Sequence, residues 1–486
     1  MTLSDRCDNF MREALPDTEV YRVGGSVRDE LLLRRCKDND YVVRGLAASA
    51  LERKLREAGA KTSLLRLRGN GPCIGVRAHV KGLGLIEVCL PRTEVSTGDG
   101  RHDFEIVVDP NLPLTQDAER RDFTINALYK QVSPELDAAE YIEDISDPTG
   151  RGLYDLQHRF LNTTHPDSFR DDPLRILRAL RFVSVLGYDL GENTLAQMRE
   201  HSHAVTGLTQ KGVSGTAFDE LCKLLMGRDV ARALRLARDT GTLAVLLPEI
   251  APMLGFDQGS RYHDLTTDEH TFVALDTAAL ADAPLRVRLA LLFHDSGKPK
   301  AAWTGEDGRK HYYAKEFGEF DRGTWFKTRD HEEVGAELWD AAAKRLNVPR
   351  ALRNDVRTLV LDHMVSTRSR VKPAKIGRMR VKYGDELLKD LLLHRACDIS
   401  GKGEGATVAD IRRLGEMEAM RVDLAAGGVP CDVKGLKIDG YDLQAEGVTG
   451  RDIGRVLAAV LDEVISQPDP LRMSREWQIE AARRLA

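Results

Sequence analysis

The pattern of apolar positions divides the chain into two parts. Up to about residue 160, short runs rich in β-branched residues alternate with glycine-containing turns, a pattern typical of strands. The predicted strands cover residues 19–22, 39–43, 71–80, 85–90 and 104–109. Beyond them, leucine and alanine recur three and four positions apart, the period of an amphipathic helix. The pattern therefore predicts an α/β head followed by an all-α remainder.

The length of the chain and its loops indicate where domains lie. At 486 residues the chain is too long for one hydrophobic core, so three or four domains are expected. Polar, glycine-containing loops lie at residues 147–152, 255–264 and 400–407. We expect a head at 1–155, a helical neck and body at 156–262, a further helical domain at 263–410 and a helical tail at 411–486.

Composition narrows the class of protein. Charged residues make up 30% and hydrophobic residues 42% of the chain, as in ordinary globular proteins. No apolar run could span a bilayer, and the acids near the N-terminus do not fit a secretory signal, so we expect a cytoplasmic protein without membrane contact. The 7 cysteines form no Cys-x-x-Cys pair, which argues against a disulfide framework or a cysteine zinc site. The formal net charge of −5 argues against indiscriminate nucleic-acid binding, although local basic stripes can still bind a particular RNA.

Asp38 and Asp40 are the most informative residues of the first part. They open the strand that Tyr41, Val42 and Val43 continue. Because residues i and i+2 project from the same strand face, both carboxylates can converge on one point. Two close anions need cations, and Mg²⁺ suits this pair because it prefers carboxylate oxygen and commonly bridges to substrate phosphates.

The turn Gly24-Gly25-Ser26 precedes these aspartates, and a short helix is predicted at residues 27–33. Glycine lets backbone N–H groups approach a phosphate, while the helix N-terminus and Arg28 add positive charge. The combination predicts metal-assisted phosphoryl transfer from a nucleoside triphosphate. It resembles the signature of the polymerase-β-like nucleotidyltransferases, which implies two Mg²⁺ ions that activate a 3′-hydroxyl and carry the triphosphate.

Two further motifs of the head contain polar residues suited to this chemistry. Glu87 is a charge inside an apolar run; it either completes the metal-binding face from a neighbouring strand or faces water on an edge strand. Asp122 and Asn126 are four positions apart, so on a helix they would share a face and could hydrogen-bond ribose hydroxyls while Arg121 reaches phosphate or sugar. A plain helix cap is the alternative for this second motif. The presence of the glycine turn and the Asp-x-Asp pair in the same head favours nucleotide binding.

Asp172 and Arg175 form a possible base-recognition pair. Pro173 fits the first turn of a helix, and the acids before it, Asp171 and Asp172, would favour its positive end, so a capping role is one interpretation. The other follows from the spacing of three, which puts an acceptor and a donor on one face. A carboxylate accepts from the exocyclic amino group of cytosine or adenine and repels the carbonyl of uracil or guanine.

Taken together, the motifs resemble the class II tRNA nucleotidyltransferases, the CCA-adding enzymes, over essentially the whole chain. The stretches that carry the resemblance are VGGSVRD with DND, PRTE, RRDFTINA, DPTGRGLYDL and DDPLRILRALRF. The resemblance implies a polymerase-β-like head, an all-α neck and body, and addition of CCA to the tRNA 3′ end from CTP and ATP without a nucleic-acid template.

The expected site residues follow motif by motif. The catalytic set is Asp38, Asp40 and Glu87, with Asp38 and Asp40 binding two Mg²⁺ ions. The nucleotide-binding set is Gly24, Gly25, Ser26, Arg28, Arg121, Asp122, Asn126, Asp172, Arg175 and Arg178. By the resemblance, the motif of Asp147, Gly150, Gly152 and Asp155 is the hinge between head and neck.

Three positions depart from the family pattern. Leu33 stands where a glycine is common, and residues 171–172 are Asp-Asp where the family has Glu-Asp. At 215–216, Gly-Thr replaces the Glu-Arg pair that usually braces the neck ahead of a helical glutamate, here Glu220. The last departure concerns the rigidity of the neck, on which the switch from C addition to A addition depends.

A second set of metal-ligand residues is spread over the helical part. It consists of His270, His294, Asp295, His331, His363 and Asp398. A lone histidine on an apolar face is usually a core residue, but the adjacent pair in LLFHDSGKPK is much less common, and imidazole with carboxylate suits a divalent transition metal. The set resembles the HD phosphohydrolase domain of some bacterial CCA-adding enzymes, which implies metal-activated hydrolysis of phosphoesters, including 2′,3′-cyclic phosphates.

Three remaining segments have open interpretations. Between the ligands, residues 310–327 form an aromatic-rich insertion, either a lid or core: Tyr312, Tyr313, Phe317, Phe320, Trp325 and Phe326. Residues 366–382 are basic without acids, and Arg170, Arg175, Arg178 and Arg181 form a second basic run; each is a solvated face or follows an RNA backbone. The tail segments 436–443 and 447–454 could contact the tRNA elbow.

Other functions stay open at this point. A poly(A) polymerase shares the head motifs, and partial enzymes add only CC or only A. From a different class, the protein could be an HD phosphohydrolase whose head only binds RNA.

Overall fold

A computed structural model of the chain describes residues 2–36, 39–67, 71–96, 104–132, 145–209, 214–259, 265–305, 308, 310–313, 316–318, 325–327, 329–402 and 408–486. Asp38, Phe320 and parts of two of the predicted boundary loops lie outside these residues. The chain forms two compact units. Unit 1 comprises Met1–Glu220 with Asp239–Leu246, and unit 2 comprises Leu221–Arg238 with Leu247–Ala486. The finer division into four domains stays a prediction.

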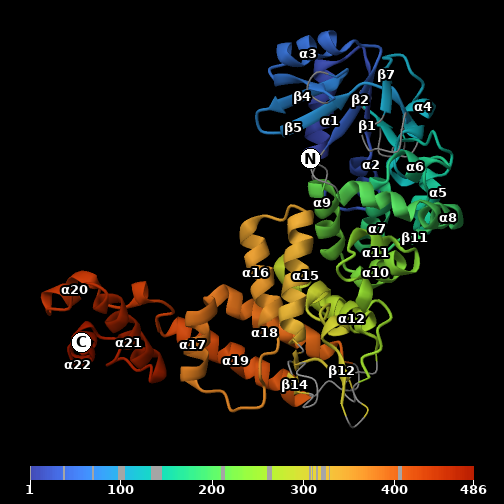
Figure 1. The fold of residues 1–486 in the computed structure, drawn as a ribbon. Coiled ribbons are helices and arrows are strands. Elements are labelled where there is room, and N and C mark those ends of the chain that lie inside the picture. The colour runs from blue at the N-terminus through green and yellow to red at the C-terminus, as the bar shows by residue number, and fades with distance from the viewer. Residues whose placement is uncertain are drawn as a thin grey trace. The chain divides into compact units, whose positions relative to one another are not determined.

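A mixed β-sheet forms the centre of the head in unit 1 (Figure 1). In the described part of the chain its strand order is β3-β4-β5-β2-β1-β8-β9. The strands are β1 Glu19–Val23, β2 Asp40–Arg44, β3 Lys61–Arg66, β4 Cys73–Val80, β5 Gly84–Cys89, β8 Tyr129–Gln131 and β9 Ile145–Ser146. Strands β2 and β5 are parallel, and the other neighbours are antiparallel.

The two faces of this sheet differ. On one face, Tyr41 and Val43 of β2 pack with α1 (Leu3–Ala14) and α3 (Ala48–Glu57) in a closed apolar core. Val42 points to the other face, because side chains alternate along a strand, and there it joins a smaller cluster. That cluster consists of Val23, Val42, Ala118, Ala127 and Tyr129. The smaller cluster leaves room for polar groups on the second face.

All five sequence-predicted strands of the head are present, and one helix needs a correction. Residues 104–108 form β7, which pairs with β6 (Arg92–Ser96) in a hairpin separate from the main sheet. The helix predicted at 27–33 is α2, Gly25–Leu31, which starts and ends earlier. It ends because Leu33 adopts the left-handed conformation, with φ 54, that the family glycine would favour.

Helices make up the rest of unit 1, apart from the short pair β10 (Phe160–Leu161) and β11 (Asp189–Leu190). They are α4 Leu114–Glu119, α5 Gly152–His158, α6 Ser168–Asp171, α7 Leu174–Leu186, α8 Glu192–His201, α11 Thr242–Leu246 and the first part of α9, Ser214–Leu225. Pro173, which the sequence places in the first turn of a helix, stands one position earlier, at the N-cap of α7, and Gly187 in the left-handed conformation ends the helix.

Unit 2 is helical almost throughout (Figure 1). Its main helices are α10 Val230–Asp239, α12 Thr267–Leu280, α13 Leu285–Phe293, α14 Lys298–Ala301, α15 His331–Arg345, α16 Arg350–Leu361, α17 Pro373–Tyr383, α18 Asp385–Ser400, α19 Val408–Ala426, α20 Gly440–Ala445, α21 Asp452–Ser466 and α22 Arg475–Leu485. The expectation of an all-α remainder is wrong for the aromatic-rich insertion, which forms hairpins. These pair β12 Trp303–Thr304 with β13 Lys310–His311, and β14 Glu316–Gly318 with β15 Trp325–Lys327.

None of the described helices combines the length and the apolar character needed to cross a membrane.

Candidate active sites

Asp40 and Glu87 lie on the second face of the head sheet. Asp40 begins β2 two positions before Val42, and Glu87 stands on β5 two positions before Cys89. Val42 and Cys89 both pack with the smaller cluster, so the alternation of side chains puts Asp40 and Glu87 on the same face. In the parallel register of β2 and β5 the two acids are direct partners. Asp38 lies outside the described residues, so its metal-binding role stays a prediction.

Glu87 does not stand on an edge strand. Strand β5 lies between β4 and β2, which excludes the edge-strand interpretation. The carboxylate of Glu87 instead accepts from Arg77 Nε at 2.8 Å in an ion pair whose side chains are 34% and 51% exposed. An exposed pair of this kind contributes little to stability, so a cation could replace Arg77 at low cost.

Gly24 and Arg28 form the turn beside these acids. Gly24 has φ 72, which a glycine adopts without strain, and it directly precedes α2. A Cβ atom at Gly24 would lie 3.6 Å from the guanidinium of Arg121. Ser26 donates from its hydroxyl to the carbonyl of Val23, which fixes the turn against β1. Two predicted phosphate-binding arginines therefore lie at or next to the glycine turn.

Asp122, Asn126, Arg28 and Arg178 form one buried hydrogen-bond network. Asn126 donates to Asp122 at 2.9 Å and accepts from Arg28 at 2.6 Å. Arg178, from α7, contacts the other oxygen of Asp122 at 2.6 Å. Burial raises the pKa of Asp122, but Arg178 and the other hydrogen bonds outweigh it and lower this pKa to about 2. The network ties α7 to the 3₁₀ turn that carries Asn126 and keeps the carboxylate of Asp122 ionised.

The local structure of this motif differs from the expectation. Asn126 lies in the 3₁₀ turn Thr124–Asn126, not in an α-helix, and Asp122 precedes the turn. The two side chains still meet, because the tighter turn brings Asn126 back toward Asp122. The predicted pairing is correct, whereas the predicted helix is wrong.

Arg121 belongs to a different network that sequence reasoning missed. It donates to the hydroxyl of Tyr129 at 2.8 Å and contacts Asp117 at 3.3 Å. Asp117 is fully buried and also binds Arg120 and the Tyr129 hydroxyl. Burial raises the pKa of Asp117, but the two arginines outweigh it and hold this pKa well below its usual range. The spacing of four between Asp117 and Arg121 is the signal that could have revealed this anchor.

Asp172 and Arg175 are held by the fold and not by each other. Asp172 accepts from the backbone N–H of Leu174 at 3.0 Å, so it caps α7. Arg175 donates to the hydroxyl of Ser168 at 2.8 Å and to the carbonyl of Arg120 at 2.5 Å. Within the described part of the chain, no hydrogen bond joins the two side chains. The capping interpretation is therefore realised, and base recognition stays a prediction.

The predicted hinge motif packs against the turn that carries Asn126. Asp147 accepts from the backbone N–H of Leu153 at 3.0 Å, which closes the turn into α5. A Cβ atom at Gly152 would lie 2.6 Å from the carbonyl of Thr124, so only glycine fits there. Asp155 is fully buried and accepts from the hydroxyl of Thr124 at 2.6 Å. Thr124 opens the 3₁₀ turn that carries Asn126, so the hinge motif directly supports the network.

A buried ion pair stands near the place where the family brace is missing. Glu220, on α9, is 4% exposed in its side chain and lies 3.1 Å from Arg181 of α7. The guanidinium of Arg181 also stacks over Phe182, 4.2 Å from the ring centroid. This pair links α7 and α9 without the Glu-Arg residues of the family pattern.

The second set of metal-ligand residues comes together in unit 2. His270 lies in α12, His294 and Asp295 follow α13, His331 begins α15, His363 follows α16, and Asp398 lies in α18. All of them are buried. We call these residues the histidine cluster. Segments separated by more than one hundred positions thus supply a single site.

Asp295 is shared by two groups of ligands within this cluster. Its Oδ2 lies 3.3 Å from His294 Nε2 and 3.5 Å from His270 Nε2, and His270 Nε2 lies 3.0 Å from Asp398 Oδ1. Its Oδ1 lies 3.6 Å from His331 Nε2 and 4.0 Å from His363 Nε2. Each group, His270-His294-Asp295 and Asp295-His331-His363, has the spacing of a metal site.

The backbone sets the hydrogen position on three of these rings. The Nδ1 atoms of His294, His331 and His363 lie 2.7, 3.2 and 2.7 Å from the carbonyl oxygens of Leu291, Tyr312 and Val360. A carbonyl only accepts, so each Nδ1 carries a hydrogen, and in a neutral ring this leaves Nε2 with a lone pair toward Asp295. This is the tautomer that a metal ligand requires.

Charge in the cluster is unevenly distributed. Burial lowers the pKa of His331 to about 4 and that of His363 well below its usual range, so both rings are neutral at pH 7. Burial also lowers the pKa of His294, but Asp295 and Asp398 outweigh it and raise this pKa to about 9. Binding of a metal at His294 must therefore displace a proton.

Lys298 and Gln258 contact this cluster, and sequence reasoning missed both. Lys298 is buried and donates from Nζ to Asp295 and to Gln258, each at 2.6 Å. Its position three residues after Asp295 is the signal for this contact. From the aromatic insertion, the carbonyl of Tyr312 accepts from the backbone N–H of His331 at 3.0 Å, so this part of the insertion packs against the cluster.

Comparisons with known proteins agree with this arrangement. A family model described as "Poly A polymerase head domain" matches residues 20–162, and one described as "Probable RNA and SrmB- binding site of polymerase A" matches residues 187–254. The "Multifunctional CCA protein" of Nitrosomonas europaea is 33% identical over 337 residues, 69% of this chain and 71% of that protein. The protein of the same name from Xanthomonas campestris is 30% identical over 472 residues, 93% of this chain and 100% of its own length.

The chain belongs to the CCA-adding tRNA nucleotidyltransferases. Solved CCA-adding enzymes share its fold. The Bacillus stearothermophilus CCA-adding enzyme in complex with CTP has a TM-score of 0.65 at 20% identity, covering 100% of this chain and 98% of that one. The Thermotoga maritima CCA-adding enzyme complexed with tRNA has a TM-score of 0.55 at 20% identity, covering 97% and 92%. The family and the fold thus match the class II CCA-adding pattern.

Proposed function

We propose that this enzyme adds C, C and A to the tRNA 3′ end from CTP and ATP, with Asp38 and Asp40 holding two Mg²⁺ ions at the head sheet. The observation that carries the proposal is the shared face of Asp40 and Glu87, beside the buried network of Asp122 and Asn126. Relatives of the same family bear the name of the complete CCA activity and not of poly(A) synthesis.

The residues of this face fit magnesium. Asp40 and Glu87 offer hard carboxylate oxygen, and neither is enclosed by apolar side chains, so the ions can keep water ligands. Bound Mg²⁺ would supply charge neutralisation at the triphosphate and activation of the 3′-hydroxyl. The glycine turn with Arg28 and Arg121 would position the phosphates.

The other residues would orient the nucleotide. Asp122 would accept hydrogen bonds from the ribose hydroxyls and Asn126 would donate to them, with Arg178 holding Asp122 in place. Asp172 and Arg175 would select cytosine and adenine. That selection requires Arg175 to exchange its contact with the Arg120 carbonyl for one with the base, since its guanidinium is engaged in the free enzyme.

A tRNA extension assay tests this proposal. Transcripts that end before the CCA, after the first C and after the second C are each incubated with all four triphosphates, and the products are sequenced. Completion to CCA from every start supports the proposal. Long A tails would show a poly(A) polymerase, and a stop after CC, or extension only of the CC-ending transcript, would show a partial enzyme.

A second activity is favoured by the histidine cluster. We propose that it binds one or two divalent transition metal ions, with Asp295 common to both positions, and hydrolyses phosphoesters, including 2′,3′-cyclic phosphates. The donor set fits such ions, because the neutral imidazoles of His331 and His363 present Nε2 lone pairs toward a buried carboxylate, and His294 presents its own once it loses a proton. The ions would supply Lewis-acid activation of water, and Lys298 would hold the carboxylate of Asp295 in place.

Metal content and hydrolysis test this second activity in the full chain. Asp295→Asn should lose both bound metal, measured by mass spectrometry, and phosphoester hydrolysis. The matched control is Asp423→Asn, which changes an exposed aspartate of α19 far along the sequence. Wild-type protein that holds no transition metal after purification and reconstitution would overturn the proposal.

A further inference from the structure

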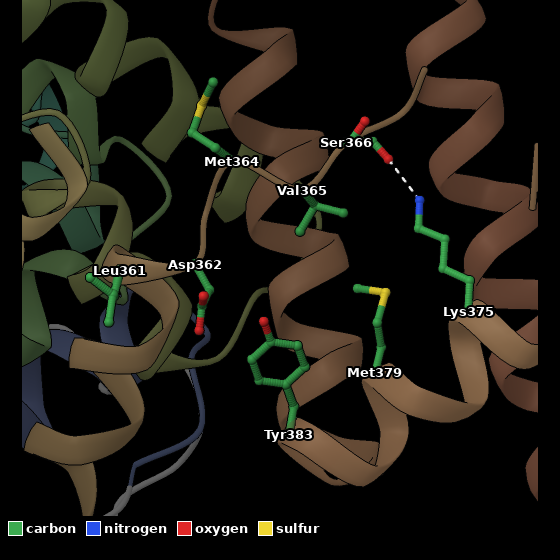
Figure 2. A pocket seen from close by; sticks show the side chains of 8 residues that line it. All are labelled: Leu361, Asp362, Met364, Val365, Ser366, Lys375, Met379 and Tyr383. Atoms are coloured by element: carbon green, nitrogen blue, oxygen red, sulfur yellow. Dashed lines mark hydrogen bonds between the residues drawn. The ribbon is translucent and has the colours of Figure 1, made fainter. Parts of the chain in front are cut away.

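A pocket opens beside His363 in unit 2, between the end of α16 and helix α17 (Figure 2). Its volume is about 270 Å³, close to the lower limit for ligand sites of roughly 300 Å³. Met364, Val365, Met379 and Tyr383 supply its apolar lining, and Asp362 and Lys375 are polar residues at its wall. We call it the α17 pocket. Its size suits one ring system rather than a whole nucleotide.

The α17 pocket is connected to the histidine cluster by the chain and by contacts. Asp362 and Met364 are the two chain neighbours of His363, so the wall begins about 3.8 Å along the backbone from a cluster residue. Arg395 donates to the sulfur of Met364 at 3.4 Å and to Asp398 of the cluster at 2.5 Å. A ligand anchored at the cluster could therefore reach the pocket with its next group.

The lining has the chemistry of a nucleobase site. The ring of Tyr383 and the flexible Met379 come from the same face of α17 and oppose Val365 (Figure 2), which suits a flat apolar ligand. Lys382 covers Tyr383 at 4.6 Å from the ring centroid and binds Asp362 Oδ1 at 3.0 Å. Asp362 also interacts with the side chain of Tyr383, and its carboxylate can accept a further hydrogen bond from an amino group at the edge of a base.

Positive charge surrounds this pocket. Arg368, Arg370 and Lys372, in the loop that leads into α17, form no ion pair with any residue that the structure describes. Among the residues that the structure describes, Lys375 donates to the Ser366 carbonyl and the Ser369 hydroxyl. Such cations suit an anionic ligand, whereas an apolar peptide segment would gain nothing from them.

We propose that the α17 pocket holds the base of the nucleotide whose phosphoester is presented to the histidine cluster. The substrate class is then a nucleoside phosphate, either free or as the terminal nucleotide of an RNA. The inference rests on the phosphohydrolase function proposed above and adds its specificity: the base is bound at Tyr383 and Met379, and the loop cations attract the phosphates.

Photolabelling locates the base without requiring turnover. Full-length enzyme is irradiated with 8-azidoadenosine 3′-phosphate, and labelled peptides are mapped. Label should appear within residues 361–383 and be displaced by 3′-AMP but not by inorganic phosphate at the same concentration. Met379→Trp fills the pocket, and Tyr383→Leu removes the ring but keeps an apolar wall; either should raise the half-labelling concentration by about 10-fold or more, since stacking on one aromatic ring is worth roughly that factor.

Val381→Trp is the matched control, because Val381 lies on the same helix but is 40% exposed. It should label like the wild type. Unchanged labelling in both pocket variants, or label confined to the head, would overturn the inference. Circular dichroism and the unfolding midpoint establish that each variant is folded. One pocket variant adds volume and the other removes it, so at least one of them should fold normally.

Kinetics separate this inference from the function on which it rests. Met379→Trp should raise KM for 3′-AMP about 10-fold, with kcat unchanged and with hydrolysis of the base-free ester β-glycerol phosphate unchanged. No hydrolysis of either ester by the wild type would refute the hydrolase, while the labelling still decides the pocket. An RNA with a 3′-phosphate that competes better than 3′-AMP identifies an RNA end as the source of the base; equal or weaker competition identifies a free nucleotide.

Discussion

The proposed metal sites of the head and of the histidine cluster both contain acids, but these acids differ in their exposure to water. In the head, Asp40 is exposed, and Glu87 is about one-third exposed and paired with Arg77. Every histidine and carboxylate of the cluster is buried, with Asp295 and Asp398 3% exposed. Exposed carboxylates remain solvated without an ion, whereas buried ones depend on their partners. The head site should therefore fold independently of metal, and the cluster should be stabilised by it.

Metal removal should produce the largest difference between the two sites. Chelation of a transition metal from the cluster should lower the unfolding midpoint of unit 2 by several degrees, since ligand binding at 100 times its Kd contributes about 2.7 kcal/mol. Removal of Mg²⁺ should leave the transition of unit 1 unchanged. Differential scanning calorimetry with and without chelator measures both. Equal shifts of the two transitions would contradict the contrast drawn between the sites.

The Arg181–Glu220 pair allows a second test, within unit 1. Glu220→Gln leaves the largely buried Arg181 without its counter-charge, which should cost about 3 kcal/mol. Because the pair joins α7, which carries Arg178, to α9, addition of A should fall more than addition of C. Single-turnover incorporation of each nucleotide measures the ratio. Glu200→Gln, on the exposed side of α8, is the control, and an unchanged ratio would show that this pair does not brace the neck.

Acid should weaken the nucleotide network of the head. The pKa of Asp122 is held at about 2 in the folded chain, below its value of about 3.9 in an unfolded chain. The ionised carboxylate therefore stabilises the fold above about pH 4, and this contribution, about 2 kcal/mol, is lost as the pH falls toward 2. Asp122→Asn should flatten the dependence of unfolding free energy on pH in that window, measured by urea denaturation. An equally steep dependence in the variant would be evidence against the network.

The smallest expected effect concerns Leu33. It adopts φ 54 and is 95% exposed, so its side chain gains nothing to offset the strain. Leu33→Gly should stabilise unit 1 by roughly 0.5 kcal/mol. The substitution relieves the strain of the left-handed backbone, and part of this gain is lost because glycine has more conformational entropy in the unfolded chain. Leu280→Gly, at an equally exposed helical position, should instead destabilise by about 1 kcal/mol. The opposite signs can be read from paired denaturation curves.

The sequence predicts local features better than distant pairings. Strand β2 and the acids on it follow from the alternation of apolar residues and from a spacing of two, both visible in a short segment. The ion pair of Glu87 with Arg77 depends on the register of β4 against β5, and the cap role of Asp172 depends on where α6 ends. Spacing along the chain does not determine either. The same limit explains why Tyr129, on strand β8, was missed as an anchor of Arg121.

For the histidine cluster, the sequence predicts the residues but not their arrangement. Residue type alone identified its members, because an adjacent His-Asp pair with further histidines is uncommon. Their grouping around Asp295, and the buried contacts of Lys298 and Arg395, required five helices to pack. Residue identity thus predicted the chemistry, while its geometry came from tertiary packing.

Two separate sites should perform two separate reactions, and matched defects in each site test this separation. Asp40→Asn and Asp295→Asn are compared in parallel for nucleotide incorporation into tRNA lacking its CCA end and for hydrolysis of a 2′,3′-cyclic phosphate. We expect Asp40→Asn to lose incorporation by about 1000-fold, as loss of a metal ligand implies, with hydrolysis intact, and Asp295→Asn to show the converse. Normal incorporation by Asp40→Asn would contradict the assignment of the head site.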